Sequence, residues 1–128
     1  MNIILGQENV VDLDGRYLVL ELDTFILAGR ADPVTAFCVL EQPSLTEMFK
    51  LPELLELHQN FVSNYKKQNW NYCVQAIEHL RGHWRGQVDS FYDDVKQRIE
   101  QYQKNPPARD WTGIINKSSS QSTATFAQ

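Results

Sequence analysis

Three side chains near the middle of the chain have the residue types of a metal site. His79 and His83 are about one helical turn apart, which would place both imidazoles on one face of a helix, and Cys73 lies shortly before them. Gly82 interrupts this helix, and no further ligand with suitable spacing accompanies them. The pattern therefore predicts no metal site, and we expect the two cysteines of the chain, Cys38 and Cys73, to be buried thiols.

Covalent and metal-assisted catalysis require other groupings of the same residue types. A cysteine nucleophile needs a histidine base, and His58 or His79 could supply one only through the fold, because such partners meet in space. The chain also contains two carboxylate pairs: Asp12 with Asp14, and Asp93 with Asp94. Two-metal catalysis needs rigidly held carboxylates, whereas the first pair lies at a turn signal and the second on a solvated helix face. We expect no catalytic residues and no cofactor.

Aromatic side chains are the remaining candidates for binding. The set comprises Tyr65, Trp70, Tyr72, Trp84, Phe91, Tyr92, Tyr102 and Trp111. Their helical spacing and the lack of interleaved basic residues favour packing between helices over a stacking platform for bases. Trp111 follows two prolines and is expected to fold back over the third helix as a clasp. Tyr65, Trp70 and Trp111 are the candidate partner-binding residues.

The elements that must position these side chains follow from the periodicity of apolar residues. The spacing predicts strands over 17–27 and 34–40 joined by a short loop, and helices over 51–68, 72–80 and 89–104, with Asp89 as a plausible cap. Strict alternation in the first strand would place Leu22 on one face and Asp23 and Phe25 on the other. Both faces carry apolar residues, which is typical of a sheet covered on both sides.

These elements predict an α+β fold in three parts. Residues 1–42 would form a small sheet of two or three strands, residues 43–116 a three-helix bundle, and residues 117–128 a disordered tail. A chain of 128 residues with 42% hydrophobic residues suffices for one domain with a core. The formal net charge of −4 and the lack of basic clusters argue against nucleic acid and anionic membranes, and no long apolar segment predicts a membrane span, so we expect a cytoplasmic protein.

Four segments together resemble the C-terminal part of class III adenylate/guanylate cyclases. Residues 20–37 (LELDTFILAGRADPVTAF) resemble the last hairpin of the catalytic domain, and residues 3–6 (IILG) resemble the strand before it. Residues 64–77 (NYKKQNWNYCVQAI) and 106–114 (PPARDWTGI) resemble the tetratricopeptide-like extension and its terminal motif in many bacterial members. The resemblance implies a cyclase-like hairpin followed by a tetratricopeptide-like bundle.

The same resemblance also shows what this segment lacks. The two metal-holding aspartates, the base-selecting residues and the Asn/Arg pair of the family all precede the matching region. The family's phosphate-contacting lysine falls on Ala28, whereas Arg30 keeps the second basic position of that loop and is a candidate phosphate-binding residue.

These observations lead to three hypotheses about function. The first is a non-catalytic interaction or regulatory module that binds a protein partner, such as a nucleotide cyclase or a second copy, through the helical hairpin, the sheet edge or both. The second is a separate subunit or split fragment that contributes to cyclase activity. The third is a component of a structural assembly.

Overall fold

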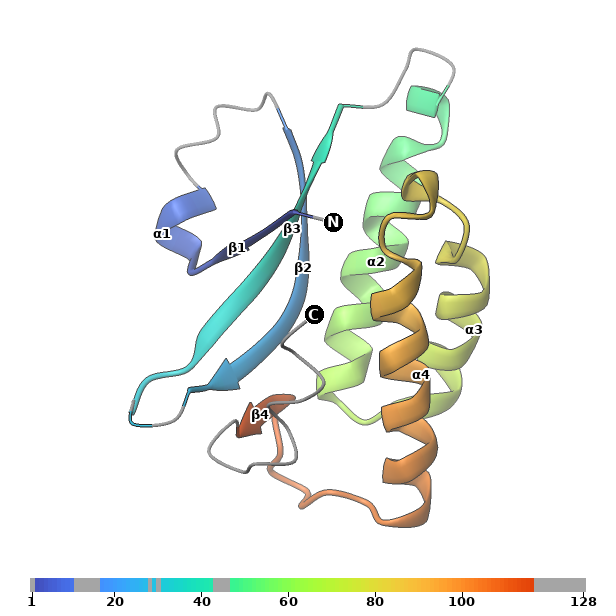
Figure 1. Ribbon diagram of the computed structural model, residues 1–128. Coiled ribbons are helices and arrows are strands. Elements are labelled where there is room, and N and C mark those ends of the chain that lie inside the picture. Colours follow the sequence, from blue (N-terminus) through green and yellow to red (C-terminus); the bar gives the residue numbers. More distant parts are fainter. Residues whose placement is uncertain (1, 11–16, 28, 30, 43–46, 117–128) are drawn as a thin grey trace.

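The computed structural model describes residues 2–10, 17–27, 29, 31–42 and 47–116 (Figure 1). In chain order the elements are β1 (Asn2–Leu5), α1 (Gln7–Val10), β2 (Tyr17–Ile26), β3 (Val34–Glu41), the 3₁₀ turn η2 (Glu47–Phe49), α2 (Leu51–Lys66), α3 (Trp70–Leu80), the 3₁₀ turn η3 (Trp84–Gly86), α4 (Asp89–Lys104) and β4 (Ile114–Asn116). The α+β prediction is confirmed. The expected disordered tail at 117–128 lies outside the described residues.

The described strands form one sheet with the order β1-β3-β2-β4. β3 pairs antiparallel with both β1 and β2, whereas β4 runs parallel to β2. The sheet is therefore larger than the two or three strands expected, because the segment after the Pro-Pro motif returns to it. Helices α2, α3 and α4 stand on one side of the sheet, and α1 lies on the other (Figure 1).

A β-bulge in β2 corrects the predicted phase of its side chains. The pairs on either side of the bulge are Glu21 with Phe37 and Thr24 with Thr35, so β2 has one more residue there than β3. The extra residue shifts the alternation, and Leu22, Asp23 and Phe25 are all buried. Asp23 consequently faces the helices, although strict alternation predicts that it points away from them.

The two helix starts also differ from the prediction. α3 begins at Trp70, because the break after α2 is confined to residues 67–69, where Gln68 adopts a left-handed φ of 64°. Asp89 does not cap α4, since Val88 occupies the N-cap position and the Asp89 carboxylate accepts the backbone N–H of Gly82 at 2.8 Å.

One hydrophobic core joins the sheet to the helices. Its fully or nearly fully buried side chains include Leu20, Cys38, Phe61, Cys73, Ile77, Leu80, Val88, Tyr92, Val95 and Ile99. These residues come from both 1–42 and 43–116, so the sheet and the bundle are packed as a unit. On the opposite face of the sheet Phe37 and Val39 are also buried, in agreement with the prediction that both faces are covered.

Candidate functional site

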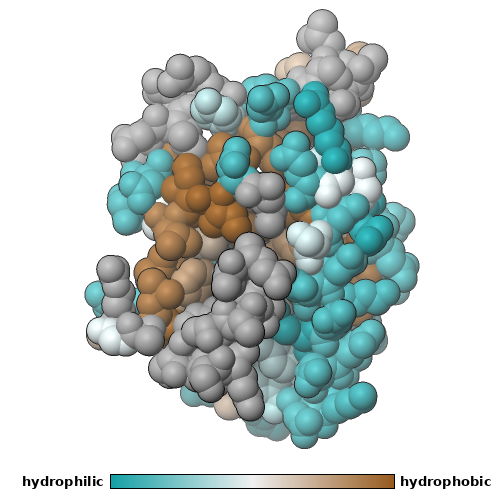
Figure 2. Space-filling view, in the orientation of Figure 1, coloured by the Kyte–Doolittle hydropathy of each residue, from teal (hydrophilic) through white to brown (hydrophobic). Residues whose placement is uncertain are grey.

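The first candidate site is the sheet edge formed by β1. β1 pairs with β3 on one side only, so the other side of its backbone is the sheet edge in the described part of the chain. Ile3 and Leu5 are both 43% exposed and share a face because they are two residues apart. Figure 2 shows a continuous hydrophobic surface on this side of the molecule, beside the polar surface of the helices. An open backbone edge with apolar side chains is a template for strand addition.

A buried chain of hydrogen bonds lies beneath the middle of the sheet. His58 on α2 is 1% exposed, and its Nε2 lies 2.6 Å from the backbone oxygen of Glu21, at the bulge. The oxygen can only accept, so Nε2 carries the proton and Nδ1 accepts from the Tyr92 hydroxyl at 2.9 Å. The Tyr92 oxygen in turn accepts the indole N–H of Trp84 at 2.9 Å. Every member is paired, so the chain fixes the tautomer and joins three elements to β2.

Burial keeps the two titratable residues of this hydrogen-bond series, His58 and Tyr92, neutral. Burial lowers the pKa of His58, and this effect outweighs the opposing contribution of its bond to Glu21. Burial likewise raises the pKa of Tyr92. His58, which the sequence allowed as a base for a thiol, therefore serves as a neutral hydrogen-bonding residue of the core.

A buried ion pair joins β2 to α4. Asp23 is 3% exposed, and both of its carboxylate oxygens accept bonds from Arg98, at 2.8 and 3.0 Å. Arg98 also donates to the Tyr65 hydroxyl at 3.1 Å. Burial opposes the charge on Arg98, yet the Asp23 carboxylate raises the pKa of the guanidinium above its usual value. The carboxylate that the bulge turns inward is therefore matched by a planar, bidentate partner.

The other chemically reactive groups are placed apart from one another. Burial raises the pKa of Cys38 to about 11 and that of Cys73 to about 12, so both thiols are protonated at neutral pH. His79 is exposed whereas Cys73 is buried, so the helix directs them to different surroundings. Among the described residues no group of three or more His, Cys, Asp or Glu side chains could hold a metal ion.

The three candidate partner-binding residues come together in one aromatic cluster, with Tyr102 as its fourth member. The ring of Trp111 lies 5.3 Å from that of Tyr65, 6.0 Å from that of Trp70 and 5.1 Å from that of Tyr102. Trp70 stacks on Tyr102 at 5.5 Å. Tyr65 is buried, and the indoles of Trp70 and Trp111 are partly buried. The cluster joins α2, α3 and α4 to the segment that leads to β4.

Gly113 explains why this segment lies so close to α2. It has a φ of +90°, and a Cβ at this position would approach the Lys66 side chain to 2.9 Å. The Trp111 indole N–H also donates to the backbone oxygen of Ile114 at 3.3 Å. The Trp-x-Gly sequence thus turns the chain and places Ile114 beside Thr24 of β2.

Arg30, the candidate phosphate-binding residue, lies outside the described residues. Two of the four segments for which a cyclase resemblance was predicted, 20–37 and 106–114, meet in space, because Thr24 of β2 pairs with Ile114. Sequence reasoning missed the paired roles of Asp23 and His58. Their positions could have indicated these roles, because each residue lies in an apolar stretch whose other residues face the core.

Comparison with known proteins adds no relative. No family model, no curated protein and no solved structure matches the chain. None of the helices in the described ranges has the length and apolar character needed to span a membrane.

Proposed function

We propose that the chain is a non-catalytic interaction module related to the C-terminal part of class III nucleotide cyclases, and that it binds the catalytic region of such a cyclase. The observation that carries the proposal is the β1 edge, where Ile3 and Leu5 remain 43% exposed on a strand that pairs with β3 on one side only. At this edge the Leu5 carbonyl accepts the exposed Asn9 side-chain amide at 2.7 Å. A strand from the partner would pair with the backbone of β1, replacing the Asn9 bond at Leu5, and would cover both side chains.

The internal use of the polar groups supports a binding role. His58, Asp23 and Arg98 are engaged in hydrogen bonds that join the sheet to the helices. The thiols are held in the protonated form by burial. These groups stabilise the fold, whereas β1 presents apolar surface outward.

The choice of partner rests on the resemblance. Residues 3–6 and 20–37 resemble the last strands of a cyclase catalytic domain, and here these residues form β1, β2 and the start of β3. In such a domain the other strands of the sheet come from the rest of the catalytic domain. In this chain β1 is the edge at which strands of a partner would pair. β1 carries no charged side chain, so it does not repel an apolar strand.

The test is binding of the purified chain to a class III cyclase catalytic domain, measured by isothermal titration calorimetry. We expect the double variant Ile3→Lys/Leu5→Lys to lose binding, because charges on an edge strand prevent strand addition. Tyr72→Lys is the matched control, since Tyr72 is 37% exposed on α3, away from the edge. Absence of binding by the unmodified chain, or equal loss in the control, contradicts the proposal.

A second candidate is a subunit that contributes to cyclase activity. The contact between the two segments of the resemblance, at Thr24 and Ile114, favours it, because both segments would be presented to the partner as one unit. Formation of cyclic nucleotide by the same mixture distinguishes the candidates: increased output supports the subunit, and binding without increased output supports the non-catalytic module. Self-association alone, measured by sedimentation, would favour a structural assembly over both.

A further inference from the structure

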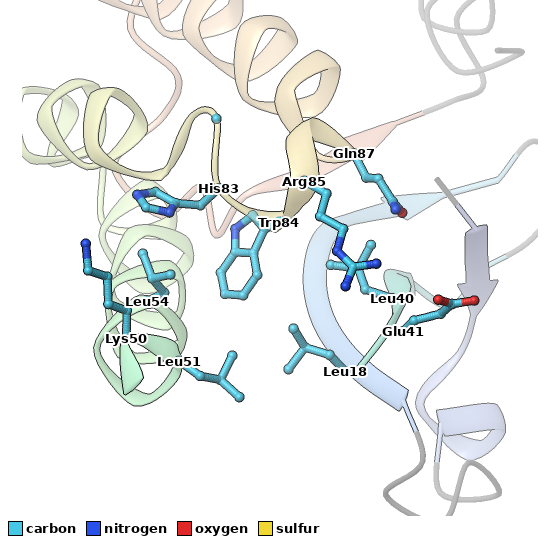
Figure 3. Close-up of a pocket in the computed structure, with 11 residues that line it drawn as sticks. Leu18, Leu40, Glu41, Lys50, Leu51, Leu54, His83, Trp84, Arg85 and Gln87 are labelled. Atoms are coloured by element: carbon cyan, nitrogen blue, oxygen red, sulfur yellow. The ribbon is translucent and has the colours of Figure 1, made fainter. Parts of the chain in front are cut away.

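The space between the sheet and the start of α2 contains a cavity (Figure 3). Its volume is about 430 Å³, which lies within the range of roughly 300–1,000 Å³ for small-molecule sites. The cavity is remote from the aromatic cluster, which joins the other end of α2 to the segment before β4. Its apolar lining consists of Leu18, Leu40, Leu51, Leu54 and Trp84.

The charged residues of the lining favour neither an anion nor a cation. Lys50 and Glu41 carry opposite charges. Arg85 also lines the cavity, but it already has an interaction within the chain. The described lining therefore offers no net free charge, and an ionised ligand would lose its hydration here without an excess of opposite charge to compensate.

Two other polar side chains of the lining have unused hydrogen-bonding groups. Within the described residues, neither the His83 imidazole nor the Gln87 carboxamide has a hydrogen-bond partner. Figure 3 shows these two side chains on either side of Trp84. A neutral imidazole and a carboxamide each provide a donor and an acceptor, so each matches a hydroxyl group, which also donates and accepts.

The loop that forms the aromatic wall of the cavity has a strained backbone. Trp84 and Arg85 have left-handed φ angles of 56° and 55°, and Gly82 and Gly86, one on each side, have φ angles of 88° and 73°. Non-glycine residues persist in this region only where the surroundings fix them. Such strain is concentrated at active sites and ligand-binding sites.

Hydrogen bonds fix this loop. The N–H of Gly82 donates to the Asp89 carboxylate at 2.8 Å, and the Trp84 indole N–H donates to the Tyr92 hydroxyl at 2.9 Å. The aromatic wall is therefore in place before any ligand arrives, which lowers the entropy lost on binding. Because its N–H is already used, Trp84 offers a ligand only apolar contact.

We propose that this cavity binds a small neutral amphiphile with a single hydroxyl group, whose hydrocarbon body lies between the leucines and Trp84 and whose hydroxyl bonds to His83. The apolar lining favours a hydrocarbon body, and the lack of net free charge disfavours an ionised head group. The site is separate from the β1 edge, so the inference does not depend on the proposed function.

The test follows the three indole N–H resonances of the ¹⁵N-labelled chain by NMR, one for each tryptophan. The Trp84 resonance is assigned as the one lost in Trp84→Phe. 1-Octanol should shift it saturably and leave those of Trp70 and Trp111 in place, because these two lie in the aromatic cluster. Octanoate and octyltrimethylammonium should both bind more weakly. No saturable shift with 1-octanol, or equal affinity for either ion, overturns the proposal.

Variants of two histidines test the contact with the hydroxyl. His83→Ala should weaken 1-octanol binding about fivefold, the effect of losing one hydrogen bond. His83→Asn keeps a donor and an acceptor and should retain most of the affinity. His79→Ala makes the first change at an exposed position outside the cavity lining and should have no effect. Unchanged affinity in His83→Ala, or an equal loss in His79→Ala, overturns the proposal.

Variants that fill the cavity test its location. Leu51→Trp should weaken 1-octanol binding at least about tenfold, because the larger ring occupies the space of the hydrocarbon body. Leu54→Trp, in the same lining, makes the same test if the first variant disturbs folding. Ile3→Lys/Leu5→Lys removes exposed apolar surface at the β1 edge and should leave the affinity unchanged. Loss of binding in this double variant, or full binding in a folded cavity-filling variant, overturns the proposal.

Discussion

The layer between sheet and helices is filled at one end and open at the other. Near β4, four aromatic rings and the Asp23–Arg98 pair occupy the space between β2 and the helix ends. Near η3, the same layer contains a cavity of about 430 Å³ and two consecutive left-handed residues. The same sheet and the same helix α2 form both ends, so the difference comes from the segments that meet them.

This contrast separates the stabilising contacts from a candidate binding site. At the filled end, close packing of rings and a paired buried charge stabilise the fold. At the open end, the chain retains unfilled volume and strained backbone, which are costs to stability. Departures from well-packed structure of this kind are expected at functional sites. The predictions below test this division.

The largest expected effect is at the buried ion pair. Arg98→Met would leave the Asp23 carboxylate buried without its partner and should lower the free energy of unfolding by about 3–5 kcal/mol. The Asp23 side chain is only 2% exposed, so water cannot replace the lost bonds. Urea unfolding measures the change.

The matched control for this variant is Arg81→Met. Arg81 makes a similar bidentate pair with Asp93, but both side chains are about half exposed. Its loss should be much smaller, because exposed pairs are screened by water. Equal losses in the two variants would contradict the claim that burial makes the filled end stabilising.

The next effect is at the aromatic cluster. Trp111→Ala should lower the free energy of unfolding by about 3 kcal/mol, at the lower end of the range for a core tryptophan because the indole is only partly buried. Hydrogen exchange should accelerate at the amides of β4, whose position depends on this contact. Trp111→Phe retains a ring in the cluster and should lose less unfolding free energy. If the β4 amides stay protected from exchange in Trp111→Ala, the cluster does not hold the strand in place.

The pH dependence of stability tests the buried histidine between the two ends. Burial lowers the pKa of His58 below its usual 6.5, so below that pH the unfolded chain binds a proton that the folded chain does not. Stability should therefore fall as the pH drops from about 7 through 6.5.

Variants of two histidines assign this slope. His58→Gln should remove it, whereas His79→Gln, a change at an exposed position, should retain it. A slope that survives in His58→Gln would refute the assignment to this residue.

The smallest effect concerns the strained loop at the open end. Arg85→Ala and Arg85→Gly both remove the side chain, but only glycine adopts a φ of 55° without steric cost. Arg85→Gly should therefore be more stable than Arg85→Ala by about 1 kcal/mol in thermal unfolding. Equal stabilities would mean that the loop is not strained.

The sequence predicts the periodic elements better than their partners. The helices and the β2–β3 hairpin follow from apolar spacing, which depends on residues close in the chain. The bulge in β2 could not be predicted, because one extra residue leaves the composition of the strand unchanged and only the pairing with β3 defines it. This missed bulge is also why Asp23 was assigned to the wrong face.

The candidate sites show the same limit. The aromatic residues could be selected by type, and the structure brings Tyr65, Trp70 and Trp111 together. Asp23 and Arg98 are 75 positions apart in the sequence. The spacing of residues around each of them therefore gives no indication that the two side chains pair. The cavity exists because the side chains of β3, α2 and η3 leave space between them. It depends on how separate segments pack, so the residue pattern of one segment cannot predict it.

The parallel pairing of β2 with β4 also influences how fast the chain can fold. Thr24 and Ile114 meet across most of the chain, whereas the β2–β3 hairpin and the α2–α3 pair form between neighbours. The entropy of closing a loop grows only with the logarithm of its length, so the distant pairing costs little at equilibrium. Contacts between remote residues slow folding much more strongly. The last strand therefore has a larger influence on the folding rate than its three residues would suggest.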